Sequence, residues 1–327
     1  MIQRRRIVLA LGASAFTLPC ASFAQKYPSA VPRLAYLSQG SPADRGAFLA
    51  AFREGLRELG WIDGKNIIID VYWAPTNEFP RIAALVVEHN PAAIVGTCIP
   101  STRAAKGATA TIPVVMSVNG DPVESGLVAS LARPGANVTG TWTLFEALIP
   151  KWLEIIDMAV SDARTVAVLA NPESVDDEYW WTQIQQHAKL ARVNVVRAEA
   201  YSGATLKHAF AAMKEQRTDA VITVADAYFL NEIQLIVKLA GDYNLPGIYG
   251  FREYAEAGGL VSYGLSYRDY FKSVARYVDR VLQGANPAAL PVQQPTKIEL
   301  AINLKTAKSL GLTIPQPLLV RADEVIQ

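Results

Sequence analysis

Hydroxyl, amide and carboxylate side chains recur directly after the predicted buried strands of this chain. Short apolar runs such as residues 113–117 and 220–224 suit buried parallel strands. The carboxyl ends of parallel strands meet at one edge of an open α/β sheet, and ligands bind at that edge. These side chains suit hydrogen bonds to a small head group such as a carboxylate. The candidate ligand-binding residues are Ser41, Thr97, Ser101, Thr102, Asn119, Asp121, Asn171, Asp226, Tyr228 and Tyr249.

Several of these residues also suit helix capping, since Ser, Thr and Asp are the preferred N-cap residues. Ser101 and Thr102 fit capping and ligand contact equally well. Asp121 is followed by Pro122, which suits a first helical position, and by Glu124, which completes a capping-box pattern. We therefore expect a helix to begin after Asp121 and interpret this residue first as its cap.

Asp226 is the acid singled out for ligand binding. It lies at the end of a predicted strand beside Tyr228 and Phe229, where its carboxylate suits the ammonium group of a ligand. It suits equally a cap for one helix that runs through Leu230 and Ile233, so both interpretations stay open. Trp180 and Trp181 resemble a stacking pair, but aromatic residues in a helix are more often core, and we interpret them so.

Catalytic motifs are absent. The sequence has no Gly-rich phosphate loop ending in Lys-Ser/Thr, no G-x-G-x-x-G, and no Cys or His cluster with metal-ligand spacing. Its three histidines fall within predicted helices, and Cys98 has no His nearby in the sequence, so a small buried side chain is the simpler interpretation. We predict no catalytic residue, no metal and no cofactor, and hence no enzyme.

The first part of the chain alternates strands and helices. Strands are expected over residues 33–37, 67–72, 92–96 and 113–117, with a second strand at the end of the stretch 112–140. A helix follows Ser41 and Pro42, with one apolar face for the sheet formed by Phe48, Phe52, Leu56 and Leu59. This order predicts a parallel sheet with helices on both faces.

A second strand series comes next, with strands expected over residues 165–170, 220–224, 247–249 and 260–263. A helix then begins at Ser266 and carries Phe271, and a further strand is expected over residues 297–303. The loops after these strands should face the loops of the first series across a cleft. With about 300 residues in the mature chain, two domains with separate cores are expected.

The N-terminus has the layout of a secretory signal peptide over residues 1–24: three arginines, an apolar run and small residues before the expected cleavage after Ala24. Arg4 to Val8 also fits a twin-arginine signal, so the export route stays open. Cys20 follows Pro19, which departs from lipoprotein signals. Removing three of the 31 basic and none of the 30 acidic residues leaves a net charge of −2, which favours neither nucleic acid nor anionic membrane. Cys98 alone remains, so no intramolecular disulfide is expected.

Four long blocks of sequence resemble one known family, in order along nearly the whole mature chain. They are residues 51–61 (AFREGLRELGW), 120–140 (GDPVESGLVASLARPGANVTG), 252–264 (REYAEAGGLVSYG) and 294–308. The family is the ABC transporter substrate-binding proteins related to tryptophan- and tyrosine-binding bacterial lipoproteins. Blocks of this length are far more specific than a short motif.

The resemblance implies a two-lobed type I periplasmic-binding-protein fold, each lobe a mostly parallel sheet flanked by helices, joined by a three-strand hinge. Lobe 1 would comprise residues 31–140 and 265–292, and lobe 2 residues 141–264 and 293–327. It also implies a periplasmic monomer that binds a small molecule, such as an aromatic amino acid or aromatic carboxylate. The partners would be an ABC permease and its ATPase.

Two other functions use the same scaffold. An exported enzyme is one, because fold alone does not determine function. A ligand-sensing domain of a regulator or receptor is the other, and it would need an attached DNA-binding or signalling module. The ligand itself is not identified by the sequence.

Overall fold

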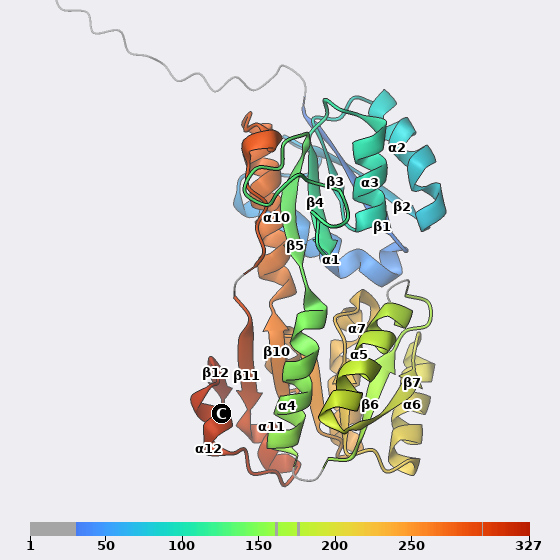
Figure 1. Ribbon diagram of the computed structural model, residues 1–327, viewed down its shortest axis with the longest axis vertical. Helices are drawn as coiled ribbons and strands as arrows, with labels where there is room; N and C mark the ends of the chain where they lie inside the picture. Colours follow the sequence, from blue (N-terminus) through green and yellow to red (C-terminus); the bar gives the residue numbers. More distant parts are fainter. Residues whose placement is uncertain (1–30, 161–162, 175–176, 296) are drawn as a thin grey trace, which may run out of the picture. The chain divides into compact units, whose positions relative to one another are not determined.

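The computed structural model contains two β-sheets flanked by helices (Figure 1). It describes residues 31–160, 163–174, 177–295 and 297–327. The predicted signal peptide lies outside these residues. The first sheet is parallel throughout, in the order β2-β1-β3-β4-β5. Its strands are β1 (Arg33–Gln39), β2 (Ile68–Ala74), β3 (Ala93–Gly96), β4 (Val114–Asn119) and β5 (Val138–Thr143).

The second sheet has the order β12-β11-β10-β9-β8-β6-β7. Its strands are β6 (Thr165–Ala170), β7 (Asn194–Glu199), β8 (Ala220–Thr223), β9 (Gly247–Phe251), β10 (Val261–Leu265), β11 (Glu299–Asn303) and β12 (Glu324–Ile326). Only the β10–β11 pair is antiparallel among the described strands. The predicted two-lobed α/β fold with mostly parallel sheets is therefore confirmed.

Helices cover both faces of the first sheet. They are α1 (Pro42–Glu58), α2 (Phe79–Glu88), α3 (Ile99–Ala108) and α10 (Tyr267–Leu282), with the short 3-10 helix η1 (Thr76–Glu78) before α2. Alternate residues of β1 point to opposite faces, as the two-residue period of a strand requires. Tyr36 packs in the cluster that holds Phe52 of α1 and Val274 of α10, whereas Leu37 packs with Phe79 of α2. We call this sheet with its four helices the first lobe.

The second lobe is the seven-stranded sheet with the remaining helices. These are η2 (Phe145–Leu148), α4 (Ile149–Ala159), α5 (Asp177–Ala191), α6 (Gly203–Glu215), α7 (Ala227–Asn231), α8 (Ile233–Asp242), α9 (Glu253–Glu256), α11 (Leu304–Ser309) and α12 (Gln316–Val320). Helix α4 packs against α5, and α6 packs against α8. Trp152 of α4 is fully buried and donates its indole N–H to the carbonyl of Tyr263 in β10 (2.7 Å).

The chain passes between the two sheets three times. It leaves the first lobe after β5 at Leu144, returns at Ser266 between β10 and α10, and leaves again between η3 (Pro287–Ala289) and β11. The third passage runs beside β5, where Gln293 pairs with Thr141. The lobe boundaries expected from the sequence remain a prediction, but these passages lie close to them.

The predicted helix after Asp121 is wrong, because that segment forms turns. Asp121 Oδ1 accepts from the backbone N–H of Val123 (2.7 Å) and Glu124 (3.2 Å), so it does cap a turn. The turn then stops at Gly126, whose φ of +72° is left-handed and cannot continue a right-handed helix.

Three smaller expectations also differ from the structure. Leu59 does not extend the apolar face of α1, since the helix ends at Glu58 and Leu59 is 39% exposed. The segment after Asp226 forms two helices, α7 and α8, rather than one. Strands β7 and β12 are not among the predicted strands, because neither has a run of fully buried residues.

Candidate functional site

A cavity of about 380 Å³ lies between the two lobes, where the carboxyl ends of their strands face each other. From the first lobe it is lined by Gln39, Arg45, Phe48, Thr76, Thr97, Cys98, Ile99, Pro100, Ser117, Val118, Asn119, Thr143, Tyr267, Tyr270 and Phe271. From the second it is lined by Phe145, Trp180, Ala225, Phe251 and Leu265. A cleft of this size at strand ends has the usual dimensions and position of a small-molecule site.

Aromatic side chains form most of its apolar wall. They are Phe48, Phe145, Trp180, Phe251, Tyr267, Tyr270 and Phe271. Phe48 of the first lobe stacks on Phe271 (centroids 4.8 Å apart) and meets Phe251 of the second lobe edge to face (6.5 Å). Phe145 also meets Phe251 edge to face, at 5.6 Å. Rings held at these distances give flat surfaces on which another ring can stack.

The polar part of the wall comes from the ends of β3, β4 and β5. Thr97 Oγ1 donates to the carbonyl of Leu37 (3.2 Å), which fixes that side chain at the strand end. Asn119 Oδ1 accepts from the backbone N–H of Phe145 and from Thr143 Oγ1, both at 3.2 Å. Because the N–H of Phe145 needs an acceptor, the amide orientation of Asn119 is fixed.

Arg45, in the first turns of α1, is the one cationic side chain among the described residues that line the cavity. No Asp or Glu belongs to that described lining. The positive charge of Arg45 acts on Asp226 of the second lobe, where it favours the carboxylate and so acts to lower its pKa. The cavity therefore combines aromatic walls with a positive charge.

Thr97 and Asn119 are the two predicted ligand-binding residues that line this cavity. Ser101 and Thr102 are buried beside it. Ser101 Oγ accepts from the N–H of Cys98 (3.2 Å) at the start of α3, and Thr102 Oγ1 donates to the carbonyl of Gly96 (3.2 Å). Both hydroxyls thus bond within their own strand and helix. Ser41 precedes α1 and does not line the cavity.

Asp226 caps α7 in the second lobe, as one of its two interpretations required. Its Oδ1 accepts from the N–H of Tyr228 (2.9 Å) and Phe229 (3.2 Å), and from Asn171 Nδ2 (3.3 Å). Burial raises the pKa of Asp226, because the charged form loses water, while the charge of Arg45 opposes that rise. Asp226, Asn171 and Tyr228 all lie outside the cavity lining.

Tyr249 lies in the core of the second lobe. It is 1% exposed and stacks on Tyr254 with ring centroids 4.5 Å apart. Asp121 caps the turn described above and does not line the cavity either. Ligand contact by the ten predicted residues stays a prediction. Thr97 and Asn119 are the two of the ten whose positions in the cavity lining support it.

Several of the lining residues that sequence reasoning missed stand on helices, and others, such as Phe251 and Leu265, stand on strands. Arg45 and Phe48 belong to α1, Trp180 to α5, and Tyr267 and Tyr270 to α10. The sequence pattern places Phe48 and Trp180 in the core, where an apolar residue of a helix usually lies. A usable signal is their place near the start of helices that follow strand ends, since such helix starts point at the ligand edge.

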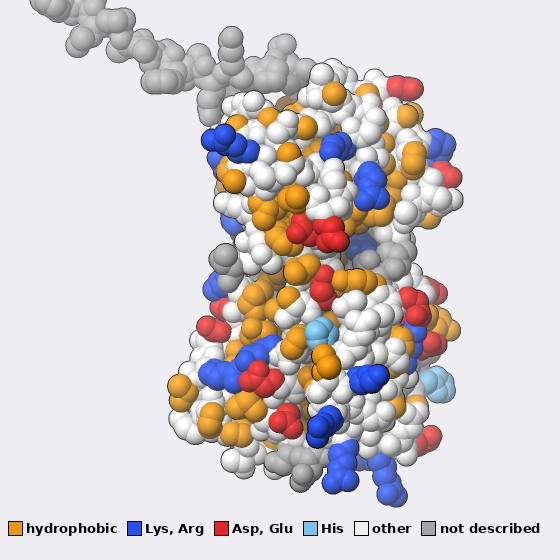
Figure 2. All heavy atoms as spheres, viewed as in Figure 1, with side chains coloured by type: hydrophobic (Ala, Val, Ile, Leu, Met, Phe, Trp, Pro, Cys, Tyr) orange, Lys and Arg blue, Asp and Glu red, His pale blue; other side chains and the backbone are white. Residues whose placement is uncertain are grey.

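No group of His, Cys, Asp or Glu in the described part of the chain is placed to hold a metal ion. None of the helices described here is long and apolar enough to cross a membrane. On the face seen in Figure 2, Lys and Arg side chains are interspersed with Asp and Glu.

The comparison with known families decides between the candidate functions. Residues 44–326 match the ABC transporter substrate binding protein family. The chain belongs to that family. It is therefore a binding protein of an ABC transporter and not an enzyme, and proteins of this family are typically extracytoplasmic.

Individual relatives agree with this assignment. The chain is 28% identical to the tyrosine-binding protein of Clostridioides difficile (strain R20291) over 80% of its own length and 75% of that protein. A conserved domain protein of Vibrio cholerae has a TM-score of 0.70 at 29% identity, covering 90% of this chain and 100% of that one. An ABC domain from Streptococcus pneumonia, solved in complex with L-Trp, has a TM-score of 0.68 at 24% identity, covering 91% and 100%.

More distant structures show the same fold. A LacI family regulator from Bifidobacterium animalis has a TM-score of 0.58 at 11% identity, covering 82% of this chain and 95% of that one. These likenesses confirm the type I fold class of this family member and carry no argument about its ligand.

Proposed function

We propose that this protein is the extracytoplasmic solute-binding component of an ABC importer and takes a small aromatic molecule into the cavity between its lobes. The ligand is an aromatic amino acid or an aromatic carboxylate. The observation that carries this is the lining, in which seven aromatic rings from both lobes surround a cavity of about 380 Å³. The relatives named for tyrosine and solved with L-Trp support a ligand of this kind.

Individual residues have distinct roles in this proposal. Trp180 and Phe48 stack on the ring of the ligand, because they lie on opposite lobes and both line the cavity. Thr97 and Asn119 bond to its polar head group at the strand ends. Ser101, Thr102 and Asp226 act indirectly, through hydrogen bonds that hold the segments forming the wall.

The protein delivers its ligand to a permease driven by an ATPase, as the family assignment supports. We place it in the periplasm as a monomer, on the strength of the family and of the signal-like residues 1–24. Mass spectrometry of exported protein would give an N-terminus near Gln25 if this placement holds.

A pair of tryptophan variants tests the binding site. Trp180 lines the cavity and is 5% exposed, whereas Trp181 points elsewhere and packs against the guanidinium of Arg197 (5.8 Å to the ring centroid). We expect Trp180→Ala to weaken an aromatic ligand by about tenfold or more, since a stacked aromatic pair contributes about 0.5–1.5 kcal/mol beyond its buried area. Trp181→Ala should bind as the wild type does.

The measurement is a thermal-shift screen of aromatic acids and amino acids, followed by titration calorimetry on the hits. Melting of each empty variant shows whether it folds. Equal affinities for a folded Trp180→Ala protein and the wild type would place the ligand elsewhere. A screen in which no aromatic compound stabilises the wild type would contradict the proposed ligand class.

A further inference from the structure

The one charged side chain among the described residues that line the cavity is positive. Arg45 supplies a guanidinium, and no described Asp or Glu side chain lines the wall. Aromatic amino acids carry a carboxylate and an ammonium group, and a buried charge needs an opposite charge or several hydrogen bonds. The described wall offers a charged partner to a carboxylate and none to an ammonium group.

The uncharged groups point the same way. Asn119 uses its Oδ1 for the N–H of Phe145 and for Thr143, so the hydrogen-bonding capacity it retains is the donor pair on Nδ2. No described residue accepts from that nitrogen. Tyr270 accepts from Ser117 Oγ (3.1 Å) through its hydroxyl oxygen. The acceptors that remain, such as the Oε1 of Gln39, are neutral, and a neutral oxygen compensates an ammonium charge only in part.

Among the acids that closely follow lining residues along the chain, Asp226 and Glu253 are already bonded within the protein, whereas Glu146, which follows Phe145, has one buried oxygen without a hydrogen-bond partner among the described residues. Asp226 comes after Ala225 and accepts from two backbone N–H groups and from Asn171. Glu253 comes two residues after Phe251 and accepts from Ser266 Oγ (2.8 Å) at the second passage between the lobes. Burial raises the pKa of both carboxyls, and the hydrogen bonds just described already occupy one oxygen of each.

We propose that the site is built for an aromatic carboxylate without an α-amino group, such as an arylpropionate, and discriminates against the matching amino acid. In this arrangement Arg45 and Asn119 Nδ2 bind the carboxylate, and the aromatic wall holds the ring. This inference rests on the proposed function, since it names the substrate class of the same cavity.

Titration calorimetry with matched ligand pairs tests the inference. The pairs are 3-phenylpropionate with L-phenylalanine, 3-(4-hydroxyphenyl)propionate with L-tyrosine, and indole-3-propionate with L-tryptophan. We expect at least one deaminated acid to bind tenfold or more tightly than its amino acid. Phenethylamine, which keeps the ring and the ammonium group but lacks the carboxylate, should not bind.

A matched pair of arginine variants tests the role of Arg45. Arg45→Gln should weaken the preferred acid by tenfold or more, and Arg45→Lys should retain part of the affinity because it keeps the charge. Arg53 stands on the same helix, is exposed and pairs with Asp63 (3.1 Å), so Arg53→Gln should bind as the wild type does. Circular dichroism of each variant checks its fold.

The outcomes separate the two proposals. If an amino acid binds more tightly than its deaminated partner, the inference is overturned while the proposed function stands. Glu146, whose Oε2 is buried without a hydrogen-bond partner among the described residues, would then be the acid to test through Glu146→Gln. If no member of any pair binds, the proposed aromatic ligand fails as well.

Discussion

At the scale of single residues, Asp226 shows how a buried acid at a strand end is used within the fold. Its carboxylate satisfies two backbone N–H groups at the start of α7, which have no partner inside the helix. Burial acts against the charged form and raises the pKa, and the backbone N–H groups and Arg45 offset part of that effect. The contributions of its capping hydrogen bonds and of its charge to stability can therefore be separated by mutation.

Two substitutions at Asp226 make that separation. Asp226→Ala removes the cap and should lower the free energy of unfolding by about 0.5–2 kcal/mol, the usual cost of losing an N-cap. Asp226→Asn keeps an oxygen that accepts from the same N–H groups but removes the charge, so it should cost less. Urea denaturation of both variants and the wild type measures these differences.

The pH dependence is set by the direction of the pKa shift. Because the folded-state pKa is above the ordinary 3.8, the carboxyl contributes stability that is full below pH 3.8 and is lost as the pH rises through the folded-state pKa. The Asp226→Asn variant does not lose stability in this way, because its side chain has no ionisable carboxyl. Its stability relative to the wild type should rise as the pH increases from 3.8 through the folded-state pKa of Asp226. A stability difference that does not change with pH above 3.8 would show that the folded-state pKa of Asp226 is not raised.

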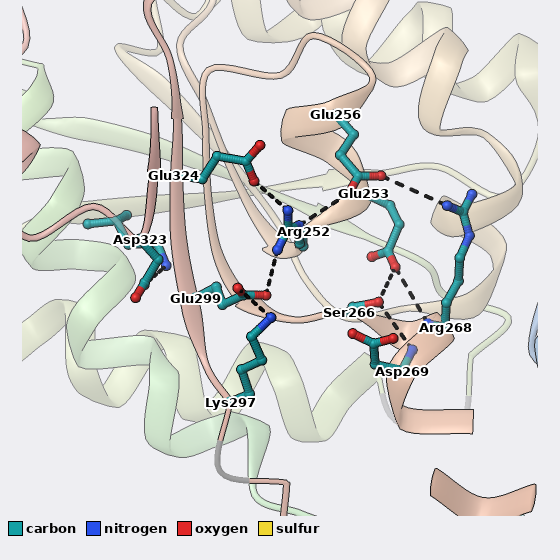
Figure 3. Close-up of polar contacts among 11 residues, drawn as sticks. Arg252, Glu253, Glu256, Ser266, Arg268, Asp269, Lys297, Glu299, Asp323 and Glu324 are labelled. Carbon is teal, nitrogen blue, oxygen red and sulfur yellow. Dashed lines mark hydrogen bonds and ion pairs between the residues drawn. The ribbon is translucent and has the colours of Figure 1, made fainter. Parts of the chain in front are cut away.

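At the scale of elements, a cluster of charged side chains ties two of the passages between the lobes together (Figure 3). Arg252, at the end of β9, contacts Glu299 at the start of β11 (2.8 Å), Glu324 of β12 (2.5 Å) and Glu256 of α9 (3.2 Å). Next to it, Glu253 accepts from Ser266 just before α10. The cluster therefore fixes the segments that enter and leave the second lobe.

Removing Arg252 should destabilise the second lobe more than removing an exposed arginine of the same cluster. Arg252→Gln leaves the mostly buried Glu299 with Lys297 as its partner (2.8 Å), and we expect a loss of about 1–3 kcal/mol. Arg268 is more exposed and lies 3.9 Å from Glu256, so Arg268→Gln should cost about 0–1 kcal/mol. Chemical denaturation at neutral pH compares the two.

The direction in which this stability difference changes at low pH follows from the pKa shift of Glu299. Burial acts to raise the pKa of Glu299, but Lys297 and Arg252 outweigh it, and the pKa lies below 4.5. The stability from this pairing is present above pH 4.5 and is lost as the pH falls through the folded-state pKa. The difference in the free energy of unfolding between wild type and Arg252→Gln should therefore narrow below pH 4.5.

Equal losses of stability for Arg252→Gln and Arg268→Gln at neutral pH would refute a structural role for the cluster.

At the scale of the whole molecule, the cavity wall is divided between lobes joined by three passages of chain. Phe48 of one lobe and Phe251 of the other both face the cavity, so a ligand there contacts both lobes at once. A ligand that makes more contacts in a closed arrangement shifts the population towards it. Hinge closure about the three passages is the motion we expect.

Small-angle scattering tests this motion. The mature protein should scatter as a monomer, and its radius of gyration should fall when a saturating ligand is added. Trp180→Ala at the same ligand concentration should show a smaller change, since fewer of its sites are filled. A radius that stays the same with every site occupied would rule out closure on binding.

The sequence by itself determined the fold class and most strands. Buried runs such as residues 165–170 predict β6 directly, because a parallel strand covered on both faces must be apolar along its length. The cap at Ser41 and the proline at Pro42 likewise predict the start of α1. The helix expected after Asp121 failed because the left-handed backbone at Gly126 ended the turn, and a capping pattern carries no information about the backbone of later residues.

The binding site was decided by tertiary structure. Sequence placed Thr97 and Asn119 correctly at strand ends, because that edge is defined by strand direction alone. Tyr249 belongs to a strand that ends at the same edge, yet its side chain packs into the core. Phe48, Trp180 and Tyr270 lie far apart in the chain and meet only when α1, α5 and α10 pack around the cavity. An aromatic residue in a helix looks the same in sequence whether it fills a core or faces a ligand, since both need an apolar surface and only packing decides which one it covers.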